Sequence, residues 1–160
     1  MLPTRALEGD RVIPSLPQGL SLSGHLSVGP RPQLLLDSSP DAVRIARHWV
    51  EAFVSAEAPG APEEHVHDVV LAVSELVTNA VRYGTEPGDS LRIVLDVGPG
   101  STRVEVHDPC RRPPRRRPAS DVRSRGRGLL VLDALAYSWG VAERPMGKAV
   151  WAEVRWVAAS

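Results

Sequence analysis

The chain shows two hydrophobic periods, one typical of helices and the other typical of strands. Apolar residues recur at i, i+3, i+4 and i+7 in two segments, which predicts two helices that each bury one face. The first helix should run from about residue 40 to residue 57, with Ser39 as its N-cap and Pro40 at its first position. The second should begin at Pro62, carry acidic residues in its first turn and end at Gly84.

Segments of alternating or β-branched residues predict the strands. Residues 91–97 and 102–108 should form a hairpin around a Gly-Pro-Gly turn, and two C-terminal strands should flank a Pro-Met-Gly turn. A short strand should precede the first helix, and the run GRGLLVLDALA should open a third helix. These elements predict one α+β domain at residues 33–157, a two-layer sandwich with helices on one face of a mixed or antiparallel sheet. Residues 1–32 would be an N-terminal extension that is at most partly ordered.

Composition narrows the class of protein. Hydrophobic residues make up 42% of the 160-residue chain and charged residues 24%, which is typical of a folded globular domain. No segment reaches the roughly 18 to 20 apolar residues that a membrane-spanning helix needs, and the N-terminus lacks a signal-peptide pattern. A single cysteine, Cys110, cannot form an internal disulfide. We therefore expect a cytoplasmic protein.

The net charge of zero conceals an asymmetry between the two parts of the chain. Residues 1–100 hold 7 basic and 13 acidic side chains, whereas residues 101–160 hold 12 basic and 6 acidic ones. The predicted loop at 109–126 contains RRPPRRR, so it could close over a phosphate, contact an acidic partner protein or bind nucleic acid through charge alone. The four tryptophans do not interleave with these arginines as a base-stacking platform would, which argues against nucleic acid.

Three polar features lie where the predicted elements end or face away from the core. Glu75 and Asn79 are four residues apart, so they share one face of the second helix. Asp108 ends a strand, and a Gly-Arg-Gly run at 126–128 starts the third helix, where free backbone N–H groups favour an anion such as phosphate. Each feature alone is typical of a solvated helix face or a loop exit. Together they indicate a nucleotide-binding site.

Motifs in these segments resemble those of a known family. ELVTNAVRYG resembles the N-box, EVHDPCRRP the second box and RGRGLLVLDAL the glycine box of the ATPase fold shared by histidine kinases, gyrase, Hsp90 and MutL. Their spacing and the ending GKAVWAEV resemble the small anti-sigma-factor serine/threonine kinases, over about residues 33–157. The resemblance implies the histidine-kinase-like ATPase fold with ATP and Mg²⁺ as cofactors. It also implies a homodimer that phosphorylates a serine or threonine of an antagonist protein and binds a sigma factor.

The resemblance implies a role for each residue that matches a motif. Asn79 matches the magnesium-ligating asparagine, whose amide oxygen is a suitable hard ligand. Glu75 matches the acid that accepts a proton from the attacking hydroxyl or water. Asp108 matches the aspartate that accepts a hydrogen bond from the adenine amino group. The remaining cofactor-binding residues would hold the phosphates, and they are Arg123, Arg125, Gly126, Arg127 and Gly128.

Two departures from the family pattern motivate an alternative function. Cys110 replaces a common glycine or serine two residues after the adenine-binding aspartate, and Ala149 replaces a common threonine whose hydroxyl would help hold the adenine site. The alternative is a non-catalytic or weakly nucleotide-binding, or even nucleotide-free, regulatory protein–protein interaction module of the same fold. A metal site at His65, His67 and Asp68 has little support, because no cysteine or acid-rich segment would complete it.

Overall fold

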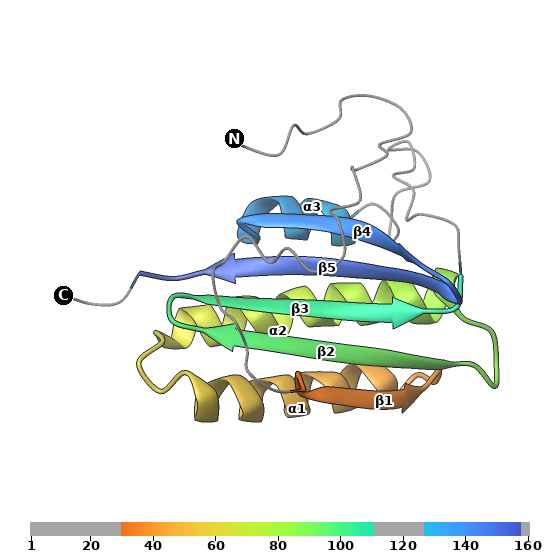
Figure 1. Ribbon diagram of the computed structural model, residues 1–160, viewed down its shortest axis with the longest axis horizontal. Helices are drawn as coiled ribbons and strands as arrows, with labels where there is room; N and C mark the ends of the chain where they lie inside the picture. Colours follow the sequence, from red (N-terminus) through yellow and green to blue (C-terminus); the bar gives the residue numbers. More distant parts are fainter. Residues whose placement is uncertain (1–29, 111–126, 158–160) are drawn as a thin grey trace.

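A computed structural model describes residues 30–110 and 127–157, and Figure 1 shows how their helices and strands are arranged. The strands are β1 (Gln33–Asp37), β2 (Ser90–Gly98), β3 (Ser101–Asp108), β4 (Ser138–Arg144) and β5 (Gly147–Arg155). The helices are α1 (Ala42–Glu57), α2 (Glu63–Asn79) and α3 (Arg127–Leu135), and a π-helical turn, η1 (Ala80–Gly84), continues α2. No helix in the described ranges is long and apolar enough to cross a membrane.

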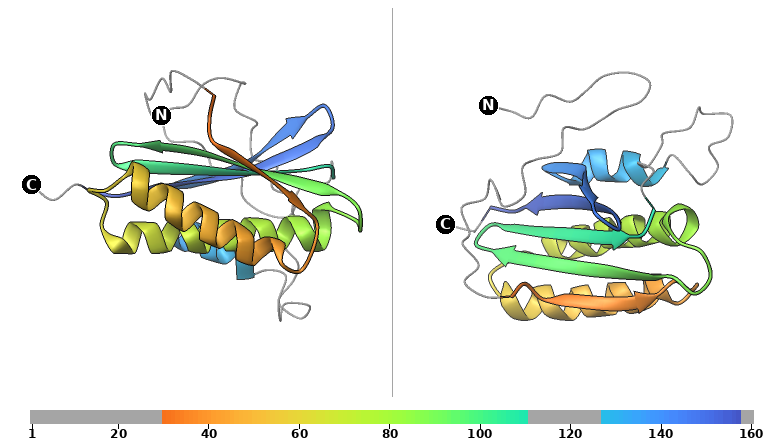
Figure 2. Two further views of the ribbon diagram at one scale, coloured as in Figure 1. Left: turned by 90° about the horizontal axis from the view of Figure 1, so that it is seen from below. Right: turned by 45° about the vertical axis from the view of Figure 1, so that its right-hand side comes forward.

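The strands form one sheet in the order β1-β2-β3-β5-β4, and every neighbouring pair is antiparallel. The helices α1, α2 and α3 lie side by side on one face of this sheet (Figures 1 and 2). The predicted α+β sandwich is therefore confirmed, with an antiparallel rather than a mixed sheet. The register pairs Asp108 directly with Lys148, which brings the end of β3 to the start of β5.

The helix α2 supplies the centre of the helical layer. Its valine stripe faces the sheet, and Val69, Val73 and Val77 are completely buried. They belong to one core cluster with Ile93 of β2 and Val104 of β3. Burying each such side chain contributes about 1.5–3 kcal/mol, so the stripe holds α2 firmly against the central strands.

The start of α1 differs from the prediction. The N-cap is Asp41, without a side-chain cap hydrogen bond, so the prediction of Ser39 as N-cap is wrong. Ser39 contributes its backbone carbonyl instead, which accepts a hydrogen bond from the first residue of the helix at 3.1 Å. In α2, by contrast, the acids Glu63 and Glu64 occupy the first turn as predicted, where they complement the positive end of the helix dipole.

The helix α2 does not end at a simple glycine stop. After Asn79 the chain widens into η1, which ends at the buried Gly84. Thr85 closes the turn, because its hydroxyl lies 3.1 Å from the carbonyl oxygen of Ala80 and 3.2 Å from that of Val81. Turns of this kind are rare and often occur at functional sites.

The sheet face without helices carries a buried carboxylate, Glu105 of β3. Oε1 lies 3.1 Å from Arg31 Nη1 and 3.1 Å from Arg103 Nε, and Oε2 lies 3.0 Å from His107 Nε2. Burial alone would raise the pKa of Glu105, but the hydrogen bond with His107 and the charges of Arg103 and Arg31 lower it to about 2. The ionised carboxylate is therefore the stable form in the folded chain.

We expect this cluster to make the fold sensitive to acid. The pKa of Glu105 is 4.5 without these contacts and about 2 in the folded chain. The stability that the ionised carboxylate contributes is therefore fully present above the unfolded pKa and is lost as the pH falls toward the folded pKa. This contribution to the free energy of unfolding is at most roughly 3 kcal/mol. Chemical denaturation across the acidic range should show this loss, and Glu105→Gln should flatten the profile. Glu143→Gln, on an exposed position of β4, is the matched control. An equally steep profile in Glu105→Gln would contradict the assignment.

Candidate functional site

Asp108 lies at the end of β3 with a side chain that is only 2% exposed. Its Oδ1 accepts hydrogen bonds from the Lys148 ammonium at 2.9 Å and from the Cys110 backbone N–H at 2.9 Å. Burial raises the pKa of this carboxyl above its ordinary value, whereas the hydrogen bond and the charge of Lys148 act in the opposite direction. Lys148 therefore favours the ionised form of a buried carboxyl group.

Two glycines let the backbone approach Asp108 closely. A Cβ atom on Gly84 would lie 2.5 Å from Asp108 Cγ, so a side chain there would displace the carboxylate. Gly147 has a φ of 144°, and a Cβ atom there would lie 1.9 Å from the Asp108 backbone carbonyl oxygen. Because Gly84 ends η1 and Gly147 begins β5, segments that are distant in the sequence meet at this carboxylate.

Glu75 and Asn79 lie half-buried on the side of α2 that faces away from α1. Val66 and Val70 line the groove between α1 and α2. Glu75 follows Val66 by nine residues, and Asn79 follows Val70 by the same number, which is two and a half turns and therefore the opposite side of the helix. The helix α3 packs beside α2 on that side (Figure 1). Both polar residues therefore face the side of α2 where the predicted phosphate-binding residues begin α3.

The predicted phosphate-binding residues are described only in part. The backbone of Arg127 and Gly128 begins α3, at the helical end whose free N–H groups favour an anion. Arg123, Arg125 and Gly126 lie outside the described residues, as does most of the predicted basic loop. Their assignment to the phosphates therefore stays a prediction.

The prediction for Ala149 is wrong. Side chains of β5 alternate between the two faces of the sheet, and Ala149 pairs with His107 on the face opposite to Asp108. An alanine at this position therefore removes no hydroxyl from the neighbourhood of the carboxylate. Lys148, one residue earlier, faces Asp108 instead, and the sequence left its role open. The sequence did contain a feature that could have pointed to Lys148, because it is the only lysine in the chain and directly follows the glycine of the last strand.

His65 is a core residue rather than a metal ligand. It is 3% exposed, and its Nε2 lies 2.9 Å from Thr102 Oγ1. Burial lowers the pKa of His65, and the charge of Asp68 acts in the opposite direction. His67, by contrast, is exposed, so the two histidine side chains do not share one environment. Within the part of the chain that the structure describes, no three histidine, cysteine or acidic side chains are grouped so as to hold a metal ion.

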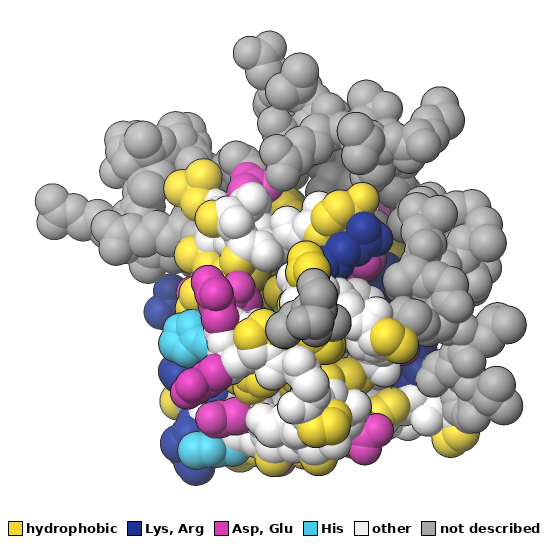
Figure 3. All heavy atoms as spheres, turned by 90° about the vertical axis from the view of Figure 1, so that its left-hand side faces the viewer, with side chains coloured by type: hydrophobic (Ala, Val, Ile, Leu, Met, Phe, Trp, Pro, Cys, Tyr) yellow, Lys and Arg dark blue, Asp and Glu magenta, His cyan; other side chains and the backbone are white. Residues whose placement is uncertain are grey.

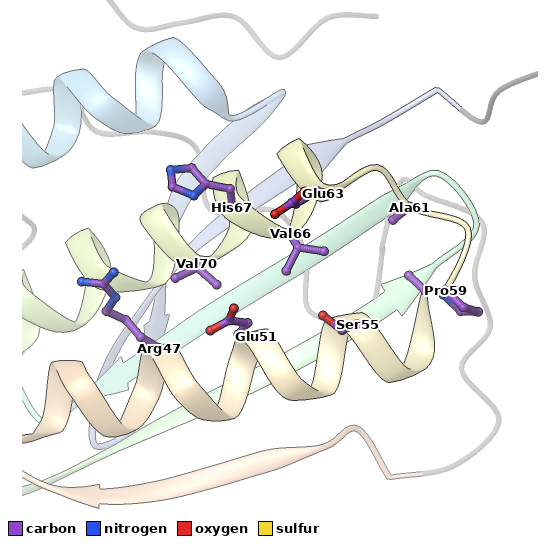
Figure 4. Close-up of a pocket in the computed structure, with 10 residues that line it drawn as sticks. Arg47, Glu51, Ser55, Pro59, Ala61, Glu63, Val66, His67 and Val70 are labelled. Atoms are coloured by element: carbon purple, nitrogen blue, oxygen red, sulfur yellow. The ribbon is translucent and has the colours of Figure 1, made fainter.

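A groove of about 430 Å³ lies between α1 and α2 (Figure 4). Val66 and Val70 line it, together with the polar residues Arg47, Glu51 and His67. Figure 3 shows the end of the molecule that bears the α1–α2 connection, where acidic, basic and histidine side chains lie along one edge. None of the predicted site residues lines this groove. It is therefore separate from the site around Asp108.

The fold agrees with the comparison with known protein families. The profile of the histidine kinase-like ATPase domain family matches residues 36–154. This range contains Glu75, Asn79 and Asp108 and the helices α1, α2 and α3. The chain belongs to the histidine kinase-like ATPase domain family. A search of curated proteins found no significant match.

Membership of this family implies ATP binding, typically together with Mg²⁺. The described residues fit both ligands. Asn79 provides an amide oxygen, a hard donor of the kind that Mg²⁺ prefers. Asp108 provides a hydrogen-bond acceptor beside a glycine that leaves no side chain in the way, and the start of α3 suits an anionic phosphate.

Proposed function

We propose that the protein is an ATP-binding regulatory serine/threonine kinase of the anti-sigma-factor type. It transfers the γ-phosphate of ATP to a serine or threonine of an antagonist protein and binds a sigma factor, as a homodimer. The supporting observation is the meeting of η1, β3 and β5 at Asp108 in a chain of the histidine kinase-like ATPase family. It brings the N-box and the second box, which the sequence carries separately, to one place. The kinase subtype and its partners rest on the motif spacing and on the ending GKAVWAEV.

Each described site residue has a part in the proposed transfer. Asp108 accepts a hydrogen bond from the adenine amino group through Oδ2, since Oδ1 already has two donors. Asn79 would hold Mg²⁺ through its amide oxygen, and the ion would neutralise charge on the phosphate oxygens. Glu75, one turn earlier on the same face, accepts the proton of the attacking hydroxyl.

Thermal unfolding with and without Mg-ATP tests the nucleotide site. A ligand at about 100 times its Kd adds about 2.7 kcal/mol, which should raise the midpoint by roughly 5 to 10 °C for a chain of this size. Asp108→Ala and Asn79→Ala should remove most of that rise, each measured against its own midpoint without nucleotide. Asp41→Ala, on an exposed position before α1, is the matched control and should keep it. An unchanged wild-type midpoint at millimolar Mg-ATP would contradict nucleotide binding.

A second candidate function is a regulatory interaction module of the same fold that transfers no phosphate. Lys148 favours it, because its ammonium already occupies one oxygen of Asp108. Cys110 does not favour it, because the contact with Asp108 uses a backbone N–H that every residue except proline possesses. Transfer of labelled γ-phosphate to a protein acceptor would support the kinase. Nucleotide binding without any transfer would support the module.

A further inference from the structure

The buried ammonium of Lys148 lies beside the Asp108 carboxylate, and its proposed role rests on the proposed nucleotide-binding function. Lys148 Nζ donates to Asp108 Oδ1 at 2.9 Å and to the Cys110 carbonyl oxygen at 3.1 Å. The two side chains are 7% and 2% exposed. Their strand positions pair directly, so the register of β3 and β5 fixes this contact.

Stability alone does not account for this ion pair. Apolar residues of similar volume often replace a buried ion pair without loss of stability, because desolvation offsets the attraction between the charges. The pair differs from an apolar one in its capacity to form hydrogen bonds. It presents an N–H donor and a carboxylate acceptor side by side at the site proposed for the base.

Counting the hydrogen bonds shows what each partner has left to offer. Lys148 carries three N–H donors, and the Asp108 and Cys110 oxygens take two of them, so one donor remains. Asp108 Oδ1 accepts from Lys148 and from the Cys110 N–H, whereas within residues 30–110 and 127–157 no donor reaches Oδ2. One acceptor and one donor therefore remain for a ligand.

The two kinds of purine differ in the order of the same two groups on their pairing edge. Adenine presents the donor N6–H next to the acceptor N1, whereas guanine and hypoxanthine present the acceptor O6 next to the donor N1–H. A carboxylate alone selects adenine, because it repels an oxygen at position 6. A carboxylate with an adjacent ammonium can satisfy either order if the base turns. The carboxylate accepts from N6–H and the ammonium donates to N1 of adenine, whereas in a turned 6-oxopurine the ammonium donates to O6 and the carboxylate accepts from N1–H.

We propose that Lys148 contacts the base and that the Asp108–Lys148 pair accepts both adenine and 6-oxopurine nucleotides. The test uses the full-length chain with Mg²⁺ and measures the Kd of ATP, ITP and GTP by calorimetric titration. ITP separates the group at position 6 from the additional 2-amino group of GTP. We expect the Kd of ITP to lie within about tenfold of that of ATP, since both make two hydrogen bonds to charged groups. Binding of ATP with ITP weaker by about a hundredfold or more would overturn the proposal.

Lys148→Met tests the role of the ammonium, because it keeps an unbranched side chain without the donor. It should weaken ITP at least about tenfold more than ATP, since O6 would then face the carboxylate alone. Equal losses for the two nucleotides would overturn the proposal. Arg44→Met, on an exposed position of α1, is the control and should leave the ratio of the two Kd values unchanged.

The proposed function and this inference fail in different ways. If the wild type binds neither ATP nor ITP, the nucleotide site itself is wrong. If the wild type binds ATP alone, the site stands and the role of Lys148 falls. The wild-type ratio of ATP to ITP affinity decides the matter even if Lys148→Met does not fold.

Discussion

Glu75→Ala should remove most of the phosphoryl transfer and leave nucleotide binding in place. Under the proposed mechanism Glu75 accepts the proton of the attacking hydroxyl, and general-base catalysis of this kind contributes about 10²–10⁴ in rate. The carboxylate shares one face of α2 with Asn79 and faces away from α1, toward the α3 side of the site. The measurement is the transfer of labelled γ-phosphate at saturating Mg-ATP to water or to an acceptor protein, with the Kd of ATP taken from titration.

Two further variants make this result specific. Glu75→Gln keeps the shape and removes the basicity, so its transfer rate should fall as far as that of Glu75→Ala. Glu51→Ala, an exposed carboxylate of α1 beside the groove, should change neither rate nor binding. Unchanged transfer in Glu75→Ala would remove the proposed base. Loss of ATP binding in that variant would instead place Glu75 among the residues that hold Mg²⁺ or phosphate.

Gly147→Ala should destabilise the fold and the site together. The φ of 144° is already strained for an alanine, and the added Cβ would lie 1.9 Å from the Asp108 carbonyl oxygen and 2.7 Å from Pro109 Cα. Both neighbours are backbone atoms, so no side-chain rotation can relieve the overlap. We expect the free energy of unfolding to fall by more than about 4 kcal/mol, which few single substitutions reach. Chemical denaturation measures it, and any folded fraction should show a smaller rise of the midpoint with Mg-ATP.

Gly88→Ala is the matched control for this substitution. Gly88 also has a positive φ, 95°, but a Cβ atom there would meet nothing within 4 Å. Its cost should therefore be limited to the backbone conformation, about 1–2 kcal/mol. The difference between the two variants isolates the close approach of β5 to Asp108. Similar losses of stability in both variants would show that the backbone conformation, and not this approach, makes Gly147 necessary.

The order and type of the elements were predictable, because each helix or strand buries one face. Its apolar residues therefore repeat along the sequence with the period of a helix or of a strand. The valines of α2 recur with the period of a helix, and they are the residues that pack against the sheet. The hairpin of β2 and β3 follows from alternating runs around a tight turn. Glu75, Asn79 and Asp108 were proposed from short motifs, each of which lies inside one segment, and their roles stay predictions.

One wrong prediction concerns a residue whose relevant neighbour is distant in the chain, and the other concerns the start of a helix. The role of Ala149 was inferred from motif spacing, but the pairing of β5 with β3 decides which face a residue occupies, and this pairing turns Lys148 toward Asp108. The N-cap of α1 was placed at Ser39 because its side chain suits that position, yet the helix begins after Asp41. The N-cap preference of serine is a local signal, and the backbone carbonyl of Ser39 accepts the hydrogen bond from Ala42 instead.

Local periodicity and short motifs, read from the sequence alone, were sufficient for the α+β architecture and the family. They were not sufficient for the surroundings of Asp108. The contact of Asp108 with Lys148 spans 40 residues of the chain, and Gly84, which approaches Asp108 closely, ends the π-helical turn that follows Asn79. Both depend on strand register and on the packing of α2 across the sheet. Such contacts arise only when segments that carry no common local pattern are brought together in the folded chain.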